Sequence, residues 1–397
     1  MWPVLPARDT LVVILAMLAL VLVATRLVQP AWWRSRPVRA GVLVAFGAML
    51  VGLGIWAVGR GTGDVAIVHT GAGLAYIGVL VFAPAALVMP ASAAIDRVLG
   101  AAVEKREEKA EDEKRSVQIS RRALIRYGSA SLPAMAAMTG ASGFVTAKSA
   151  PTTPVVTFRF PGLHPDLDGL RILHLSDLHL GACLGLDDLE RGLAAARALR
   201  PDLVVLTGDL ADDSDLIEPA LRMIHGFGAR YGAVASLGNH EYLHGIEVTR
   251  PAYERSPVPL LVGTSRTLRI GRAKLVIGGA DDPVHMGGDI AWMVEGSIDS
   301  AMKHAGDADF RLLLCHRPEG LVPASERDVD LVLSGHTHGG QVGFLGRSIF
   351  DKLRPGHFWW GPYGRKNTRL YTTSGFGHWF PFRLGCPTEM PLVVLRA

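Results

Sequence analysis

The chain has 397 residues, which at about 150 residues per domain suggests two or three units. Hydrophobic residues make up 49% and charged residues 20%, which excludes a disordered chain, and three widely spaced cysteines exclude a small disulfide scaffold. The formal net charge of +4 arises before residue 127, since residues 127–397 have more acidic than basic side chains. Without a basic surplus there, this part is not expected to bind nucleic acid.

The first 95 residues contain three apolar runs without charged side chains. A helix needs about 20 residues to span the ~30 Å of bilayer hydrocarbon, so these runs predict a membrane anchor of three transmembrane helices over 1–95. A weaker run predicts a fourth transmembrane or signal-like helix within 127–150. Buried helices of a soluble core are the alternative, which three runs with short connections disfavour. The three runs cover 10–25, 40–58 and 65–95.

Basic residues indicate the orientation of the anchor. Four arginines lie between the first two runs, and nine Lys and Arg lie in 96–126, which the positive-inside rule places in the cytoplasm. We therefore predict a charged cytoplasmic connector over 96–126. One further crossing would place 151–397 outside the cytoplasm of a bacterial cell, in the periplasm or the exterior, on a multi-pass protein of the inner (cell) membrane.

The segment Ser120-Arg121-Arg122-Ala123-Leu124-Ile125 resembles a twin-arginine export signal that lacks the usual Phe. An ordinary basic flank of a membrane helix is the alternative, and both place the later residues outside. Val145-Thr146-Ala147 could be a cleavage site, although we expect the domain to remain attached.

From residue 170 onward, short apolar runs alternate with helical stretches, which predicts an α/β fold. Several of the runs are apolar throughout, as expected for strands of a sheet that is covered on both faces. The predicted helices are 186–199, 215–228 and 289–304, and the predicted strands are 170–176, 202–207, 231–237, 273–279, 310–315, 329–334 and 391–395.

Polar side chains typical of metal sites follow five of these strands. Ligands gather at the carboxyl ends of strands in such folds, so we expect these residues to converge. Singly each motif is commonplace, but the ordered set D-x-H, G-D, G-N-H-E, H and G-H-x-H is specific. Its residues are Asp177, His179, Asp209, Asn239, His240, Glu241, His316, His336 and His338.

These residue types suit a pair of metal ions. Two ions about 3.5–4 Å apart can hold both the attacking and the leaving oxygen of a phosphoryl group. A shared carboxylate with imidazole and amide ligands fits two divalent ions such as Mn, Fe or Zn. Glycines beside the ligands would allow sharp turns and a close backbone approach.

Over about 155–397 the sequence resembles the calcineurin-like metallophosphoesterase superfamily, on the motifs above. The resemblance implies a four-layer α/β/β/α sandwich, which would follow the N-terminal transmembrane helices predicted from the apolar runs, and attack on phosphorus by an ionised, metal-bound water. It implies one ion at Asp177, His179 and His338, a second at Asn239, His316 and His336, and Asp209 between them.

The same resemblance implies a catalytic role for His240 near the leaving oxygen, as a general acid or as a hydrogen-bond donor. The resemblance further implies that Asp212 orients His240, and the alternative for Asp212 is a place in an acidic, solvated loop. Glu241 stands where the family more often has Asp. No G-D-x-x-D-R-G arrangement occurs, which disfavours phosphoprotein substrates.

The extended motif GHTHGGQ, which ends at Gln341, is similar to that of bacterial membrane-anchored or twin-arginine-exported phosphodiesterases. The similarity implies phosphodiester or pyrophosphate substrates, with lipid-linked and nucleotide-linked forms among them. Two rival hypotheses remain: a catalytically silent membrane-anchored scaffold, which the complete ligand set disfavours, and a transporter, which the lack of charge within runs 10–95 disfavours.

Overall fold

The computed structural model describes the chain in two separate units, Trp2–Val145 and Thr146–Ala397. The division falls within the last turn of the predicted fourth helix, and the finer domain boundaries stay predictions. The residues described are 26, 34, 36–62, 64–78, 80, 83–107, 121–181, 183–283, 290–303, 305–378 and 380–397.

The first unit is helical, and α3 packs closely on α4. At this contact a methyl group on Gly71 would collide with the backbone of Trp56, so small residues let the two helices approach. Asp64 caps the second helix, because its side chain accepts hydrogen bonds from the amides of Ala66 and Ile67 at 2.9 and 3.1 Å. The helices are α3 (Arg36–Thr62), α4 (Val65–Ile77), α5 (Ala83–Glu107) and α6 (Arg121–Ala147).

In the described part of this unit, one segment, Arg39–Gly59 within α3, is long and apolar enough to cross a membrane. It coincides with the predicted run 40–58. The run 10–25 lies outside the described residues. Within the run 65–95, the described residues 65–77 form α4 and 83–95 begin α5, and the fourth run lies in α6, which contains Pro133. Whether these helices span a bilayer stays a prediction.

The second unit contains a five-stranded sheet of mixed direction. Its order is β1-β13-β2-β3-β4, in which β13 runs antiparallel to β2 and the other neighbours are parallel. The carboxyl ends of β2, β3 and β4 therefore share one edge. The bounds are β1 (Val155–Arg159), β13 (Leu392–Arg396), β2 (Arg171–Leu175), β3 (Leu203–Thr207) and β4 (Ala233–Ser236).

A second sheet has six strands in the order β11-β12-β8-β7-β6-β5. The inner four strands are parallel, and an antiparallel strand closes each side. The bounds are β11 (Gly361–Arg365), β12 (Thr368–Thr372), β8 (Leu331–Ser334), β7 (Phe310–Leu314), β6 (Ala273–Gly279) and β5 (Thr264–Ile270). A small hairpin pairs β9 (Gly343–Phe344) with β10 (Arg347–Ser348).

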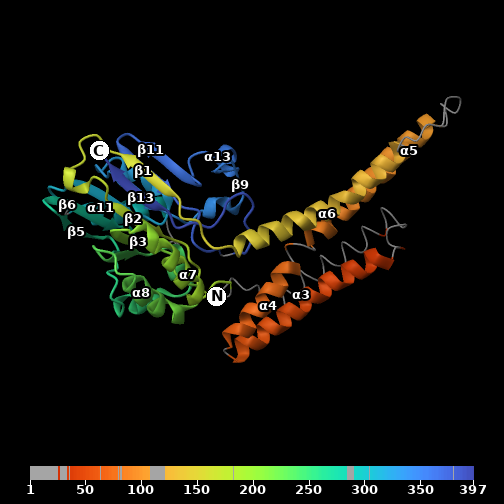
Figure 1. The fold of residues 1–397 in the computed structure, drawn as a ribbon, viewed down its shortest axis with the longest axis horizontal. Coiled ribbons are helices and arrows are strands. Elements are labelled where there is room, and N and C mark those ends of the chain that lie inside the picture. The colour runs from red at the N-terminus through yellow and green to blue at the C-terminus, as the bar shows by residue number, and fades with distance from the viewer. Residues whose placement is uncertain are drawn as a thin grey trace. The chain divides into compact units, whose positions relative to one another are not determined.

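Three apolar clusters stack the elements in the order helices, sheet, sheet, helices. Alternate residues of each strand face opposite sides, so Ile172 lies in the cluster between the sheets while Leu173 faces the helices. The second sheet divides in the same way between Leu312 and Leu313. Figure 1 shows α7 and α8 beside β3. The helices are α7 (Leu186–Ala196), α8 (Ile217–Gly226), α9 (Asn239–Leu243), α10 (Ile246–Glu254), α11 (Ile290–Met302), α12 (Leu321–Ala324) and α13 (Phe350–Leu353).

All seven predicted strands are confirmed, as β2, β3, β4, β6, β7, β8 and β13, and the predicted helices contain α7, α8 and α11. The strands that the prediction missed lie mainly at sheet edges. In β5 most side chains are exposed or half-buried, and β11 contains Gly and Pro. Neither has the continuous apolar run on which the prediction relied.

The cluster between the sheets gives a stability prediction. We expect Leu312→Ala to lower the free energy of unfolding by about 2–5 kcal/mol, because it leaves a cavity among fully buried neighbours. The matched variant Leu353→Ala, at a side chain that is 69% exposed, should change it by under about 0.5 kcal/mol. Denaturant unfolding of both variants measures the difference, and equal losses would contradict the packing described.

Candidate metal centre

The predicted ligands lie together where the strands of both sheets end. Asp177 and His179 follow β2, Asp209 follows β3, and Asn239 begins α9 after β4. His316 follows β7 of the second sheet, and its neighbour strand β8 leads to the loop that carries both histidines of the G-H-x-H motif. The site is thus assembled from both sheets.

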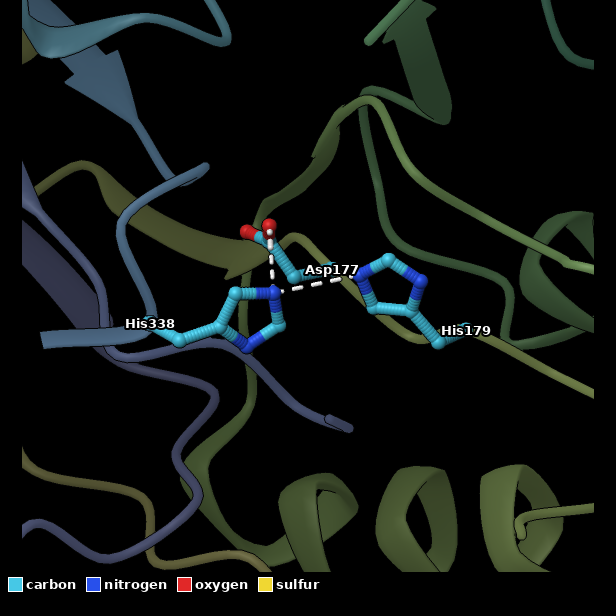
Figure 2. A group of neighbouring side chains, drawn as sticks. All are labelled: Asp177, His179 and His338. Carbon is cyan, nitrogen blue, oxygen red and sulfur yellow. Dashed lines mark hydrogen bonds and ion pairs between the residues drawn. The ribbon is translucent and has the colours of Figure 1, made fainter. Parts of the chain in front are cut away.

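Three side chains form a first group, drawn in Figure 2. The Nε2 atoms of His179 and His338 are 3.1 Å apart, and His338 Nε2 is 3.3 Å from Asp177 Oδ1. The two carboxylate oxygens of Asp177 also accept from the backbone N–H of His336 at 3.0 and 3.1 Å. Two ring nitrogens and a carboxylate that meet at one point are a donor set suited to a divalent metal.

A second group lies around His316. Its Nε2 is 3.1 Å from Asn239 Oδ1 and 3.2 Å from Asp209 Oδ2, while its Nδ1 donates to the carbonyl of Thr207 at 2.7 Å. The bond at Nδ1 leaves Nε2 as the ligand atom, which is the usual arrangement of a metal-binding histidine. The ring of His336 lies against that of His316, with centroids 5.0 Å apart.

Asp209 faces both groups. The same oxygen, Oδ2, is 3.7 Å from His179 Nε2 and 3.2 Å from His316 Nε2. Its other oxygen accepts the backbone N–H of His240 at 2.9 Å, which fixes the orientation of the carboxylate. One buried carboxylate that reaches ligands of both groups could be shared by two ions.

Five of these ligands have left-handed backbones. L residues adopt this conformation at a cost of about 1–3 kcal/mol, and such strain is concentrated at functional sites. Strain at five positions of one cluster indicates that the loops are shaped for the site. The φ angles are 53° at Asp177, 47° at His179, 52° at Asp209, 68° at His336 and 50° at His338.

Glycines beside the ligands permit the close packing that the sequence predicted. A methyl group on Gly335 would collide with the carboxylate of Asp177, and one on Gly238 would collide with that of Asp209. The backbone of each loop therefore lies directly against the ligand of the neighbouring loop.

Burial and neighbouring charges set the protonation of the ligands. Burial lowers the pKa of His336 and His338 well below the usual value, and the nearby His316 and His179 lower it further, so both imidazoles are neutral and able to bind a metal. His316 differs: although burial disfavours its charge, Asp209 raises its pKa to about 10. A metal at His316 would therefore displace a proton. Once His316 has lost this proton, the nitrogen and oxygen donors of the cluster fit divalent ions.

Asp212 connects three histidines. Its Oδ1 is 3.0 Å from His179 Nδ1, 2.9 Å from His240 Nδ1 and 3.1 Å from His244 Nε2. Asp212 thus contacts His240 as the orienting role requires, and it also contacts a predicted ligand. Burial opposes the charge of Asp212, but His179 and its hydrogen bond hold the pKa of the carboxyl well below its usual range.

Glu241 clamps two of the ligand-bearing loops. It is fully buried and accepts the backbone N–H groups of Asp209, Leu210 and Gly238 at 3.0, 2.9 and 2.7 Å, and the hydroxyl of Tyr253 at 3.0 Å. The residue noted as a departure from the family pattern thus holds the loop of Asp209 to the start of α9.

Four residues near the site were not predicted. His244 lies one helical turn after His240, and Asp282 lies just beyond β6, so helical spacing and strand ends respectively could have identified them. Arg317 directly follows His316 and contacts His336. Arg383, fully buried, donates to the carbonyl of His338 and lies 3.1 Å from its Nδ1; a lone arginine in a sequence more often faces water.

Comparison with known proteins supports a phosphoesterase site. The family model for calcineurin-like phosphoesterase matches residues 170–340. An uncharacterized metallophosphoesterase of Campylobacter jejuni is 32% identical over 255 residues, which are 62% of this chain and 63% of the relative. One of Aquifex aeolicus is 30% identical over 239 residues, 57% of this chain and 85% of the relative.

A protein of Danio rerio named as a transmembrane protein with metallophosphoesterase domain is 29% identical over 282 residues, 64% of this chain and 59% of the relative. The chain spans about three-fifths of the length of several of the metallophosphoesterase relatives that it matches. The similarity thus includes relatives named for a membrane segment.

The Asp212 contacts give a titration prediction. Burial opposes the charge of His240, but Asp209 and the hydrogen bond to Asp212 raise its pKa to about 9. In the metal-free chain we expect the His240 resonances to titrate near pH 9, and Asp212→Asn to lower that midpoint because it removes a negative charge. NMR titration with His240→Gln for assignment measures both. A midpoint unmoved by Asp212→Asn would contradict the contact.

Proposed function

The chain belongs to the calcineurin-like phosphoesterase family, and we propose that it is a dinuclear phosphodiesterase or pyrophosphatase that acts outside the cytoplasm. Family membership makes it a metal-dependent phosphoester hydrolase. The number of ions, the substrate class and the location are parts of the proposal.

The position of Asp209 supports two ions better than one. Its Oδ2 lies within 3.7 Å of a ligand nitrogen from each group, and the groups are otherwise built from different residues. A single ion would use the donor atoms of one group and leave the converging donors of the other without a metal. We assign one ion to Asp177, His179 and His338, the other to Asn239, His316 and His336, and Asp209 to both.

Two divalent ions, when bound, supply Lewis acidity and a nucleophile from water at neutral pH. The protein holds the ligands in place through backbone contacts, such as those of Glu241 with the Asp209 loop. Mn, Fe and Zn all suit the oxygen and nitrogen donors.

His240 is suited to serve the leaving group. Its Nδ1 is tied to Asp212, its side chain is 20% exposed, and its raised pKa keeps it protonated at neutral pH. A protonated imidazole at the edge of the site can donate its Nε2 proton to a departing oxygen or hydrogen-bond a phosphoryl oxygen. Asp212 acts here as a positioning residue, because it holds the ring through Nδ1.

Two features support a membrane-attached enzyme that faces outward. The segment Arg39–Gly59 is long and apolar enough to span, and the distribution of basic residues predicts an outward-facing C-terminal unit. Phosphodiesters and pyrophosphates, lipid-linked or nucleotide-linked, are the proposed substrates, and the membrane is the proposed partner. Transport and nucleic-acid binding gain no support.

Asp209→Ala tests the shared carboxylate. The purified full-length chain with Mn should hydrolyse a bis-aryl phosphate, and the variant should lose activity by about a thousandfold, since both ions lose a ligand. The control Asp168→Ala should keep its activity, because the exposed carboxylate of Asp168 pairs with Arg396 and contacts none of the ligands. Undiminished activity in Asp209→Ala would refute the dinuclear site, and an inactive unmodified chain would favour the silent scaffold.

Fusions test the orientation. A reporter enzyme that works only outside the cytoplasm, joined after residue 160, should be active, whereas the same reporter joined within 108–120 should be silent. Both fusions keep the predicted anchor. Activity in the second fusion alone would reverse the orientation and point to substrates of the cytoplasmic leaflet.

A further inference from the structure

A buried arginine lies beside the proposed second ion. Arg317 follows His316, and its side chain is only 15% exposed. Its Nε donates to Asp282 Oδ1 at 2.9 Å, and its Nη1 lies 2.8 Å from His336 Nε2. The guanidinium thus adjoins a predicted ligand without belonging to either ligand group.

Asp282 holds this arginine in place. Its side chain is 2% exposed, and its Oδ1 accepts from Arg317, while Oδ2 is buried and has no hydrogen-bond partner within the described part of the chain. Asp282, His316 and His336 bring ligand atoms within 4.8 Å of one another, so the pair of Asp282 and Arg317 lies at the edge of the metal centre. A buried guanidinium and carboxylate that contact each other beside the ligands also keep the arginine from turning to solvent.

Arg317 has N–H groups that are not used in the two contacts above. A guanidinium carries five N–H groups, and with described residues its side chain makes only the two contacts above. The contact with His336 is itself exchangeable. If His336 Nε2 binds the metal, its lone pair is used and it cannot accept from Arg317. If Nδ1 binds the metal instead, Nε2 of the neutral ring carries the proton and again cannot accept. A loaded site would therefore release a further N–H of Arg317.

We propose that Arg317, held by Asp282, binds the phosphoryl oxygens of the substrate and of the product phosphomonoester beside His336, a group for which inorganic phosphate is the probe. The planar fork of a guanidinium matches two phosphoryl oxygens, which a lysine ammonium does not. The assignment of the anion as a substrate group rests on the proposed phosphoester hydrolysis. Arg317 would add a positive charge to a site whose carboxylates the ions neutralise.

The test measures inorganic phosphate binding to the full-length, Mn-loaded chain by calorimetry, with Mn content determined for each sample. Arg317→Ala should weaken phosphate binding about 10- to 100-fold at unchanged Mn content, which corresponds to the loss of charge-assisted hydrogen bonds. Arg317→Lys should recover only part of the affinity, and Asp282→Asn should give a smaller loss. The control Arg327→Ala removes a comparably shielded arginine, 19% exposed, that pairs with Glu295 and Asp299 away from the ligands.

The outcomes separate this inference from the proposed function. Equal phosphate affinity in Arg317→Ala and Arg327→Ala would overturn the inference, while hydrolysis of the bis-aryl phosphate by the unmodified chain would leave the function intact. Loss of Mn from both Arg317 variants would also overturn it, because the arginine would then serve the ligands. Absence of hydrolysis by the unmodified chain, with Arg317-dependent phosphate binding retained, would overturn the function and leave the anion site standing.

Discussion

Hydrogen bonds join the two sheets at the metal centre: His316 Nδ1, beyond β7, donates to the carbonyl of Thr207, the last residue of β3, and the backbone N–H of His336, beyond β8, donates to Asp177, beyond β2. The site depends on these contacts, because each proposed ion takes ligands from both sheets. The apolar cluster between the sheets, which includes Val205 and Leu312, packs the two sheets together and so fixes the separation of those strand ends. Core packing therefore sets the distance between ligand groups, and Asp209 can reach both only while the sheets stay together.

The loops at this edge store strain and buried charge that the rest of the fold must offset. Five ligands adopt left-handed backbones, and Asp177 and Asp209 are buried a short distance apart. Burial raises the pKa of Asp177, whereas His316 and its neighbours hold the pKa of Asp209 well below its usual range despite burial. Glu241 counteracts the strain by accepting three backbone amides from two loops. A site organised in this way is costly to form and needs little rearrangement to accept cations.

Two carboxylates, Asp212 and Asp282, orient polar side chains around the ligands. Asp212 orients His240 and His179 together, so the proposed proton donor and a proposed ligand share one carboxylate. On the other side, Asp282 pairs with Arg317. Positive groups thus lie on two sides of the centre, where a phosphoryl group would carry its charge.

The sequence by itself determined the seven core strands, the identities of the polar residues that follow them, and the apolar segment at 40–58. These are local properties: a continuous apolar run specifies a buried strand, and Asp, Asn and His specify ligand chemistry. The family resemblance already implied Asp209 between the two groups, whereas only the tertiary structure decided that Glu241 clamps the loops, that Asp282 lies at the site and that Arg383 is buried against His338. Contacts at this site join segments far apart in the chain, as between His179 and His338, which are 159 positions apart. They arise from the packing of two sheets against each other, which no pattern along a single strand encodes.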